Sequence, residues 1–347
     1  MNYDALLEYA ATNQCSDIHL TEGRPPSFRR HGVLSEGTGR IVTQDDILDL
    51  LDDAQRFRFS GGHDLDFARS YGGRRQRVNV FRETSRVAAS IRLLNDRIPS
   101  IEELNLPPAV GVLADEPRGL VLVTGPTGSG KSTTLAAMVN HISKSRACHI
   151  LTIEDPIEYV YPPGRALIHQ REVGRDTESF AASLRSALRE DPDVILVGEM
   201  RDYETINAAV TAAETGHLVL STLHTTGAAR TVERIIGVFP SDGQAQIRSQ
   251  LAGVLRGVVT QALLPKADGS GRIAATEVLI GTDAILNLIR EGKGHQINSM
   301  LQAGGALGMH TLDGSLAQLV RGGMITRTTA EAVSPNPRDL AQLLSGR

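Results

Sequence analysis

The chain has 347 residues, of which 41% are hydrophobic and 22% are charged, and its formal net charge is -4. This length is typical of two domains, each large enough to bury its own hydrophobic core. The slightly acidic balance argues against a protein that binds nucleic acid over its whole surface, although a local basic face is compatible with it.

Two cysteines, Cys15 and Cys148, lie far apart and form no CxxC pair. Neither a disulfide framework nor a zinc knuckle is therefore expected, and a reducing cytoplasm suits the chain. The N-terminal segment has no basic stretch followed by an apolar run, so it does not predict a signal peptide. Apolar runs such as GLVLV are too short to cross a bilayer, and we expect membrane contact only through a partner.

The first hundred residues predict a small α+β domain. The elements expected first are a helix over residues 3–12, a strand over 17–20 and a helix over 43–51, with Thr43 as its N-cap. Residues 64–94 then alternate polar and apolar side chains around Gly72 and Gly73. This alternation predicts a meander of strands.

Three prolines mark residues 99–108 as an interdomain linker, so we expect one domain over 1–98 and a second over 109–347. In the second domain, β-type apolar runs alternate with Ala-rich helical stretches, the pattern of a parallel sheet with crossover helices. The expected strands are 120–124, 150–153, 194–197 and 218–222. A β-hairpin turning at 268–271 follows, and short helices are expected from about 283 to 347.

The stretch LVTGPTGSGKSTTL, residues 122–135, matches the pattern GxxxxGK[ST] between a strand-like run and a helix-like run. Its glycines let backbone N–H groups turn inward around phosphate oxygens, and the following helix adds its positive N-terminal end. Lys131 would reach the terminal phosphates, and Ser132 would offer its hydroxyl to Mg²⁺. The sequence therefore predicts ATP and Mg²⁺, with contacts from Gly125, Pro126, Thr127, Gly128, Ser129, Gly130, Lys131, Ser132 and Thr133.

Two acidic segments follow strand-like runs. In DPDVILVGEMRD the acid is Glu199, which we expect to hold the water shell of Mg²⁺, because the usual aspartate ligand is missing. The alternative is that Glu199 only caps the next helix. In TIEDPIEYV, Glu154, Asp155 and Glu158 follow a strand whose carboxyl end would face the active site. One of them would deprotonate the attacking water, or all three are solvated loop charges.

His217 and His224 flank the apolar run LVLSTL, and on a straight strand they would point to opposite faces, so they cannot share a metal ion. Each histidine taken alone also fits a structural role. His224 lies at the expected carboxyl end of the strand, where it would contact the γ-phosphate or respond to its loss.

Arginines are frequent in the first domain, at Arg74, Arg75, Arg77, Arg82, Arg86 and Arg92. A solvated face explains most of them, and a nucleic-acid patch is an alternative, although few aromatic residues are interleaved. In a ring of identical subunits, some could instead act on the neighbour's γ-phosphate as arginine fingers. The candidates for that role are Arg77, Arg86 and Arg92.

Four motifs stand in a fixed order: GPTGSGKST, TIEDPIE, DPDVILVGEMRD and TGHLVLSTLHTT. Together they resemble the Walker A motif, Asp box, Walker B motif and His box of the secretion ATPase superfamily, which contains the hexameric motors of type IV pili and of type II and type IV secretion. The resemblance implies a PAS-like α+β N-terminal domain and a RecA-like P-loop ATPase domain. It also implies that Glu158 is the catalytic base, that Glu199 lies beside Mg²⁺, and that His217 and His224 couple the nucleotide to subunit geometry.

Residues 284–316, AILNLIREGKGHQINSMLQAGGALGMHTLDGSL, are similar to the signature helix of type IV pilus retraction ATPases and the segment after it. Leu286 departs from that helix, which usually carries arginine there. The resemblance implies a homohexameric ATPase at the cytoplasmic face of the inner membrane that turns a platform protein and withdraws pilin, without binding nucleic acid. The alternatives are an accessory retraction ATPase, a type IVB secretion ATPase, a DNA-translocating RecA-type ATPase, and a nucleotide-binding regulator that hydrolyses little.

Overall fold

The computed structural model describes residues 3–30, 33–37, 39–71, 74–94 and 97–345. The predicted turn at Gly72 and Gly73 lies outside the described residues. The chain divides into two compact units. The first comprises Met1–Arg97 together with Pro156–Val160, and the second comprises Ile98–Asp155 and Tyr161–Arg347.

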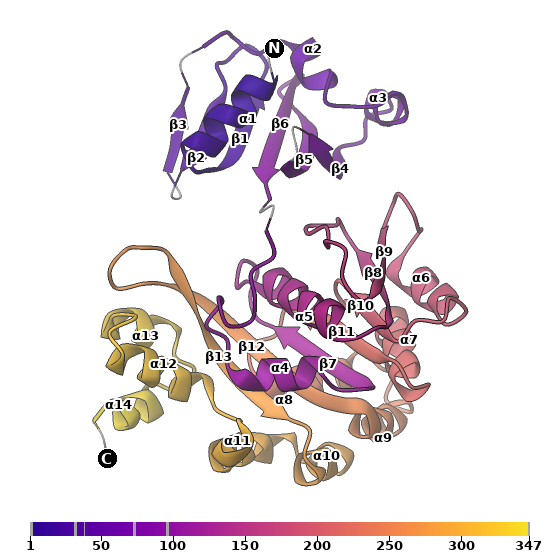
Figure 1. Cartoon of the computed structure of the whole chain (residues 1–347), viewed down its shortest axis with the longest axis vertical. Helices are drawn as coiled ribbons and strands as arrows, with labels where there is room; N and C mark the ends of the chain where they lie inside the picture. Colours follow the sequence, from indigo (N-terminus) through magenta and orange to yellow (C-terminus); the bar gives the residue numbers. More distant parts are fainter. Residues whose placement is uncertain (1–2, 31–32, 38, 72–73, 95–96, 346–347) are drawn as a thin grey trace. The chain divides into compact units, whose positions relative to one another are not determined.

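The first unit is built on a six-stranded antiparallel sheet with the strand order β3-β2-β1-β6-β5-β4 (Figure 1). Its elements are α1 (Tyr3–Thr12), β1 (Cys15–Thr21), β2 (Ser27–Arg30), β3 (Val33–Glu36), α2 (Gln44–Leu48), α3 (Asp53–Ser60), β4 (Leu65–Tyr71), β5 (Arg74–Glu83) and β6 (Arg86–Leu93). Val78 and Val80 of β5 are fully buried between less buried neighbours, which is the period-2 pattern that predicts a strand with one face on a core. Thr43 caps α2 in a capping box with Asp46, so the predicted start of this helix is confirmed.

The second unit contains a seven-stranded sheet with the order β13-β12-β7-β11-β10-β8-β9 (Figure 1). Only the pair β12 and β13 is antiparallel. The elements up to the last strand are α4 (Pro108–Ala114), β7 (Gly119–Thr124), α5 (Lys131–Ser145), β8 (His149–Glu154), β9 (Leu167–Glu172), α6 (Phe180–Ala187), β10 (Val194–Val197), α7 (Tyr203–Glu214), β11 (Leu218–Leu223), α8 (Ala228–Gly237), α9 (Gln244–Val254), β12 (Leu255–Pro265) and β13 (Arg272–Ile280).

Both faces of the central strands are covered, which explains their uninterrupted apolar runs. Every residue of β7, β10 and β11 is buried. Helices α4 and α5 pack on one face, where Met138 and Ile142 of α5 join a core cluster with Val121. Helices α6 to α9 pack on the other face, where Leu184 and Ile206 join a cluster with Leu122.

The four strands predicted in this sheet and the hairpin after them are confirmed, but two further stretches of strand were missed. These are β9, at the edge of the sheet, and the first part of β12, which begins at Leu255 rather than near the hairpin turn. The sequence of β9, LIHQRE, has two apolar residues followed by four polar ones, as is compatible with an edge strand that has only one neighbouring strand. It therefore lacks the apolar run that revealed the central strands.

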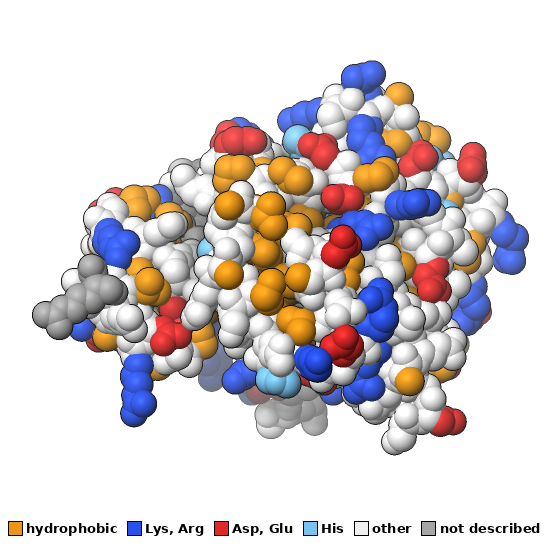
Figure 2. All heavy atoms as spheres, turned by 90° about the horizontal axis from the view of Figure 1, so that it is seen from below, with side chains coloured by type: hydrophobic (Ala, Val, Ile, Leu, Met, Phe, Trp, Pro, Cys, Tyr) orange, Lys and Arg blue, Asp and Glu red, His pale blue; other side chains and the backbone are white. Residues whose placement is uncertain are grey.

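Short helices form the C-terminal part, as expected: α10 (Asp283–Arg290), η1 (Gly294–Gln296), α11 (Ile297–Ala303), η2 (Gly305–Leu307), α12 (Leu312–Arg321), α13 (Arg327–Val333) and α14 (Pro337–Ser345). Figure 2 shows a band of hydrophobic side chains across the face of the second unit that carries α10 and α11 in Figure 1. Val112 of α4 and Leu307 of η2 are more than half exposed. No helix among the described residues is both long and apolar enough to span a membrane.

We expect Gly257→Ala to destabilise the second unit by about 2 kcal/mol, because a Cβ at Gly257 of β12 would lie 2.6 Å from Leu113 Cδ2 and 2.8 Å from the Leu279 carbonyl oxygen. Gly253→Ala is a matched control, since nothing lies within 4 Å of its added Cβ at the end of α9. Calorimetry of both purified variants measures the effect. Equal melting temperatures would contradict the packing described for β12.

Candidate nucleotide-binding site

The P-loop, residues 125–130, joins the end of β7 to the start of α5. Gly125, Gly128 and Gly130 have φ values of 138°, 80° and 91°, in the region that other residues rarely adopt. Nothing lies within 4 Å of a Cβ built on Gly128, whereas a Cβ on Gly125 would meet the Gln261 carbonyl oxygen at 2.3 Å. Together with the N-terminus of the 15-residue helix α5, this backbone has the character of a phosphate cradle.

Strand β12, which pairs with β7, also supports the P-loop. Thr260 of β12 shares a buried hydrogen bond of 2.8 Å with Thr124, the last residue of β7. Ser129 Oγ and Gln261 Oε1 are buried and have no hydrogen-bond partner within the described part of the chain. Sequence reasoning missed Thr260 and Gln261, because they follow the P-loop by more than a hundred residues in a strand that was only half foreseen.

Three predicted residues meet at the carboxyl ends of three neighbouring strands. The Lys131 ammonium donates to the carbonyl oxygens of Gly125 at 2.9 Å and Pro126 at 3.1 Å, and lies 3.5 Å from His224 Nδ1. The other ring nitrogen, His224 Nε2, lies 3.3 Å from Glu199 Oε2. Lys131, His224 and Glu199 therefore form one connected cluster, in which a basic and an acidic group stand beside the P-loop.

Glu199 is held on both of its carboxylate oxygens, since Arg201 Nε pairs with Oε1 at 2.7 Å while His224 faces Oε2. The alternative role of Glu199 as a helix cap is wrong, because Asp202 caps α7 and accepts a hydrogen bond of 2.8 Å from the Thr205 N–H. The Arg201 contact was not predicted. It leaves the glutamate next to a charged side chain that is 72% exposed.

The oxygen groups beside the P-loop fit Mg²⁺ in chemical type. Ser132 is exposed in the first turn of α5, and Glu199 supplies a carboxylate. Within the described residues, no group of three or more His, Cys, Asp or Glu side chains could hold a metal ion by itself. A magnesium ion at this site would therefore use Ser132, water held by Glu199 and oxygens of the nucleotide.

The acids of the Asp box separate into two groups. Glu154 ends β8, where its Oε1 accepts hydrogen bonds from Thr152 Oγ1 at 2.7 Å and Gln170 Nε2 at 3.2 Å. Glu158 lies in Pro156–Val160, the segment that belongs to the first compact unit. Its assignment as catalytic base stays a prediction.

His217 lies at the amino end of β11, away from the P-loop of its own chain. Strand β11 runs parallel to β7, with Leu218 beside Gly119 and Leu223 beside Thr124, so His217 is at the amino end of the sheet. Six residues of strand separate it from the P-loop end, a distance of about 20 Å. Its Nδ1 instead faces the Ala212 carbonyl oxygen at 2.9 Å. The role of His217 in coupling the nucleotide to subunit geometry, which the resemblance implies, stays a prediction, and its contact within its own chain fits the structural alternative.

Two of the three arginine-finger candidates have acidic partners in the first unit. Arg77 pairs with Asp66 at 2.6 Å, and Arg92 Nε donates to Asp17 Oδ1 at 2.9 Å. Burial raises the pKa of Asp17, but hydrogen bonds from Ser16 and Arg92 outweigh it and leave that pKa below its ordinary value. Arg86 is exposed at the start of β6. The role of all three in a neighbouring subunit stays a prediction.

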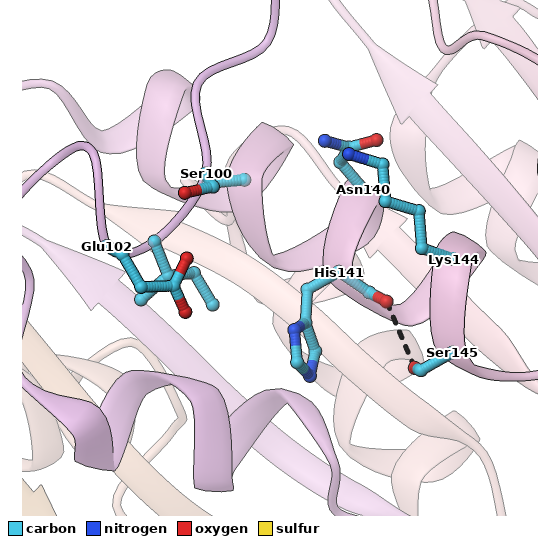
Figure 3. A pocket seen from close by; sticks show the side chains of 8 residues that line it. Ser100, Glu102, Asn140, His141, Lys144 and Ser145 are labelled. Atoms are coloured by element: carbon cyan, nitrogen blue, oxygen red, sulfur yellow. Dashed lines mark hydrogen bonds between the residues drawn. The ribbon is translucent and has the colours of Figure 1, made fainter.

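A cavity of about 260 Å³ lies along the C-terminal half of α5. It is lined by Ser100, Ile101, Glu102, Ala137, Asn140, His141, Lys144 and Ser145. Figure 3 shows the side chains of Asn140 and Lys144 side by side at its edge, and the Ser145 hydroxyl bonded to the His141 carbonyl oxygen at 3.0 Å. Since the P-loop precedes the opposite end of α5, this cavity is separate from the nucleotide site.

We expect Glu199→Gln to lower the ATP turnover number by about 100-fold or more while ATP still binds, because a neutral amide would hold the water shell of Mg²⁺ less strongly than a carboxylate does. Asp202→Asn is a suitable control, since asparagine also caps a helix and the residue lies outside the cluster. Steady-state hydrolysis and titration with a fluorescent ATP analogue separate the two quantities. Equal turnover in the two variants would remove Glu199 from the chemistry.

Comparison with known proteins agrees with the motifs. The family model described as type II/IV secretion system protein matches residues 77–312. A type IV pilus retraction ATPase, PilT, from Pseudomonas aeruginosa is 47% identical over 344 residues, which cover 98% of this chain and 100% of that relative. A twitching motility protein from Neisseria gonorrhoeae is 49% identical, with 91% of this chain and 86% of the relative covered.

Among solved structures, the pilus retraction motor PilT with bound ADP aligns with a TM-score of 0.92 and 44% identity, and the alignment covers 99% of each chain. The predicted fold class, an α+β N-terminal domain followed by a RecA-like P-loop ATPase domain, is thereby confirmed. The four motifs, the cluster at the strand ends and the extent of these matches lead to one assignment. The chain belongs to the type II/IV secretion system protein family.

Proposed function

We propose that this protein is the ATP-hydrolysing motor of type IV pilus retraction, the activity that drives twitching motility. The observation that carries the proposal is the cluster of Lys131, His224 and Glu199 beside the P-loop, in a chain that matches a retraction ATPase over nearly its whole length. The cluster alone would support only a nucleotide site. The match to a retraction ATPase over nearly the whole chain is what supports the mechanical activity.

The chemistry follows from the residues at the strand ends. Backbone N–H groups of the P-loop hold the phosphates, and Lys131 turns from the loop carbonyls to the terminal phosphate oxygens. Ser132 and the water shell of Glu199 hold Mg²⁺, which neutralises charge on the phosphates when bound. Glu158 takes a proton from a water molecule while the oxygen of that water attacks the γ-phosphorus. The bond from that phosphorus to the ADP oxygen breaks, and ADP and phosphate leave.

Mechanical work requires different contacts in the ATP and ADP states. His224 touches both Lys131 and Glu199, so loss of the γ-phosphate changes its surroundings directly. We propose a homohexamer in which Arg77, Arg86 or Arg92 acts on the nucleotide of the neighbouring subunit. The ring acts at the cytoplasmic face of the inner membrane on a platform protein, and it needs no nucleic acid.

Leu286 keeps a second candidate function open, that of an accessory retraction ATPase or a type IVB secretion ATPase. Its side chain is half-buried and packs against the core of the second unit. A surface contact made by arginine at this position of the signature helix is therefore absent in this chain. The exposed residues Asn287 and Arg290 of α10 remain available for contact with a partner.

In the native host, we expect chromosomal Glu158→Gln to leave abundant surface pili that no longer retract, because the ring assembles and binds ATP but does not hydrolyse it. Pilus counts and live-cell recording of retraction test this, with Lys131→Ala as the control that cannot hold the nucleotide. Loss of surface pili would indicate that the protein drives pilus assembly instead. Normal retraction would indicate a role in secretion instead of pilus retraction.

Arg92 can be tested as an arginine finger against its own ion-pair partner. Arg92→Ala removes both the ion pair with Asp17 and the finger, whereas Asp17→Asn keeps the finger and removes the ion pairs of Asp17 with Arg92 and Arg29. If Arg92 acts on the neighbouring site, we expect turnover to fall by about 10³-fold in Arg92→Ala and by less than about tenfold in Asp17→Asn. Similar losses in both would mean that the ion pair is structural.

The assay pH affects this comparison. Because the pKa of folded Asp17 is depressed, its ionised form stabilises the first unit above about pH 4, and this stabilisation is lost as the pH falls through the folded pKa. Assays near pH 7 therefore measure both variants where the full contribution of the ion pair is present. Thermal unfolding of the wild type at falling pH should show the loss of stability directly.

A further inference from the structure

Glu277 is a buried acid on β13 that the proposed mechanism does not use. Its side chain is 7% exposed, and its Oε1 accepts a hydrogen bond of 2.7 Å from the Ala228 N–H. Ala228 is the first residue of α8, whose N-cap position is Gly227, a residue without a side chain to cap the helix. Glu277 therefore caps α8 from a neighbouring strand, where a carboxylate also complements the positive end of the helix.

The same carboxylate lies at the start of α12. Burial raises the pKa of Glu277, and the N–H groups of Ala228 and Leu312 partly oppose this by hydrogen bonding to the charged form. Leu312 is the first residue of α12. Strand β13 has further ties to this segment, since Ser315 Oγ accepts from the Thr276 N–H at 3.0 Å. One buried side chain thus faces the N-termini of two helices.

The helix that Glu277 caps begins directly after the nucleotide site. Only three residues separate Ala228 from His224, which contacts Lys131 and Glu199. Thr231 of α8 reaches back to this stretch: its Oγ1 donates to the Gly227 carbonyl oxygen at 2.9 Å and shares a hydrogen bond of 2.7 Å with Thr225 Oγ1. Residues 224–228 are therefore fixed at one end by the nucleotide cluster and at the other by Glu277.

We propose that Glu277 is a positioning residue for ATP hydrolysis, which holds the start of α8 so that His224 keeps its place and which transmits movement of His224 to α12. A segment of three residues tied at both ends has little freedom to absorb a displacement of His224. The start of α8, Glu277 and the start of α12 then move together. This inference depends on ATP hydrolysis and not on pilus retraction, so a failure of the pilus experiments would leave it standing.

The competing explanation is that Glu277 only attaches α12 to the sheet. Three variants separate the two: Glu277→Ala removes both contacts, Glu277→Gln keeps an acceptor for the Ala228 N–H but not for a second donor, and Ser315→Ala removes a tie to α12 that does not involve α8. We expect the turnover number to fall about tenfold in Glu277→Ala, with the KM for ATP within about threefold of wild type. We expect the turnover number to stay within about threefold of wild type in Glu277→Gln and within about twofold of wild type in Ser315→Ala.

Equal losses in Glu277→Ala and Ser315→Ala would overturn the positioning role, and so would wild-type turnover in Glu277→Ala. If Glu277→Ala does not fold, Glu277→Gln decides the matter through the second readout. That readout is hydrogen exchange of the full-length protein with and without a non-hydrolysable ATP analogue, followed over residues 125–135 and over α12.

In the wild type, we expect the analogue to change exchange in both segments. In Glu277→Gln, the P-loop response should persist while the response of α12 is lost, because the amide group presents a donor to the Leu312 N–H. An unchanged response of α12 in Glu277→Gln, or no response of α12 in the wild type, would show that Glu277 does not connect the two sites.

Discussion

The parallel pairing of β7, β11 and β10 is the constraint on which the nucleotide site depends. Val123 lies beside Thr222, and Leu196 lies beside Leu220, so the three strands end at the same edge of the sheet. Lys131, His224 and Glu199 each follow one of these strands closely in the chain. Hydrogen bonding of the backbone therefore brings together a P-loop, a histidine and an acid that are separated by up to 93 residues in sequence. The apolar cores on both faces hold this edge in place.

The central strands and the P-loop were predictable because their signals are local. A run of apolar residues predicts a strand buried on both faces, and a glycine pattern before a helix predicts a phosphate cradle. His224 followed from the same argument, since it comes directly after a predicted strand. His217 was assigned to the nucleotide by resemblance alone. The direction of its strand, once the parallel register is known, places it at the opposite end of the sheet.

The contacts that support the site from a distance were not predictable in this way. Thr260 and Gln261 reach the P-loop only because β12 pairs with β7, and nothing in the local sequence of β12 indicates its neighbour. The acidic cap of α8 was hidden for the same reason. Gly227 is a weak local start signal for a helix, and the missing cap comes from Glu277, a residue 49 positions after Ala228. Long-range hydrogen bonds of this kind leave no periodic pattern in either segment.

Buried polar groups at these supporting positions have a physical consequence for a motor. An apolar contact loses strength gradually as surfaces slide, whereas a buried carboxylate that loses its N–H partner is left with an unpaired charge of high cost. Glu277 and Asp313 are both more than 90% buried, and both carry raised pKa values caused first by burial. Each carboxylate is therefore stabilised by its partner, Ala228 for Glu277 and Ser334 for Asp313. Through Glu277 the start of α8 is tied to β13, and through Ser334 the start of α12 is tied to the end of α13, so displacing either helix alone would break a hydrogen bond to a buried carboxylate.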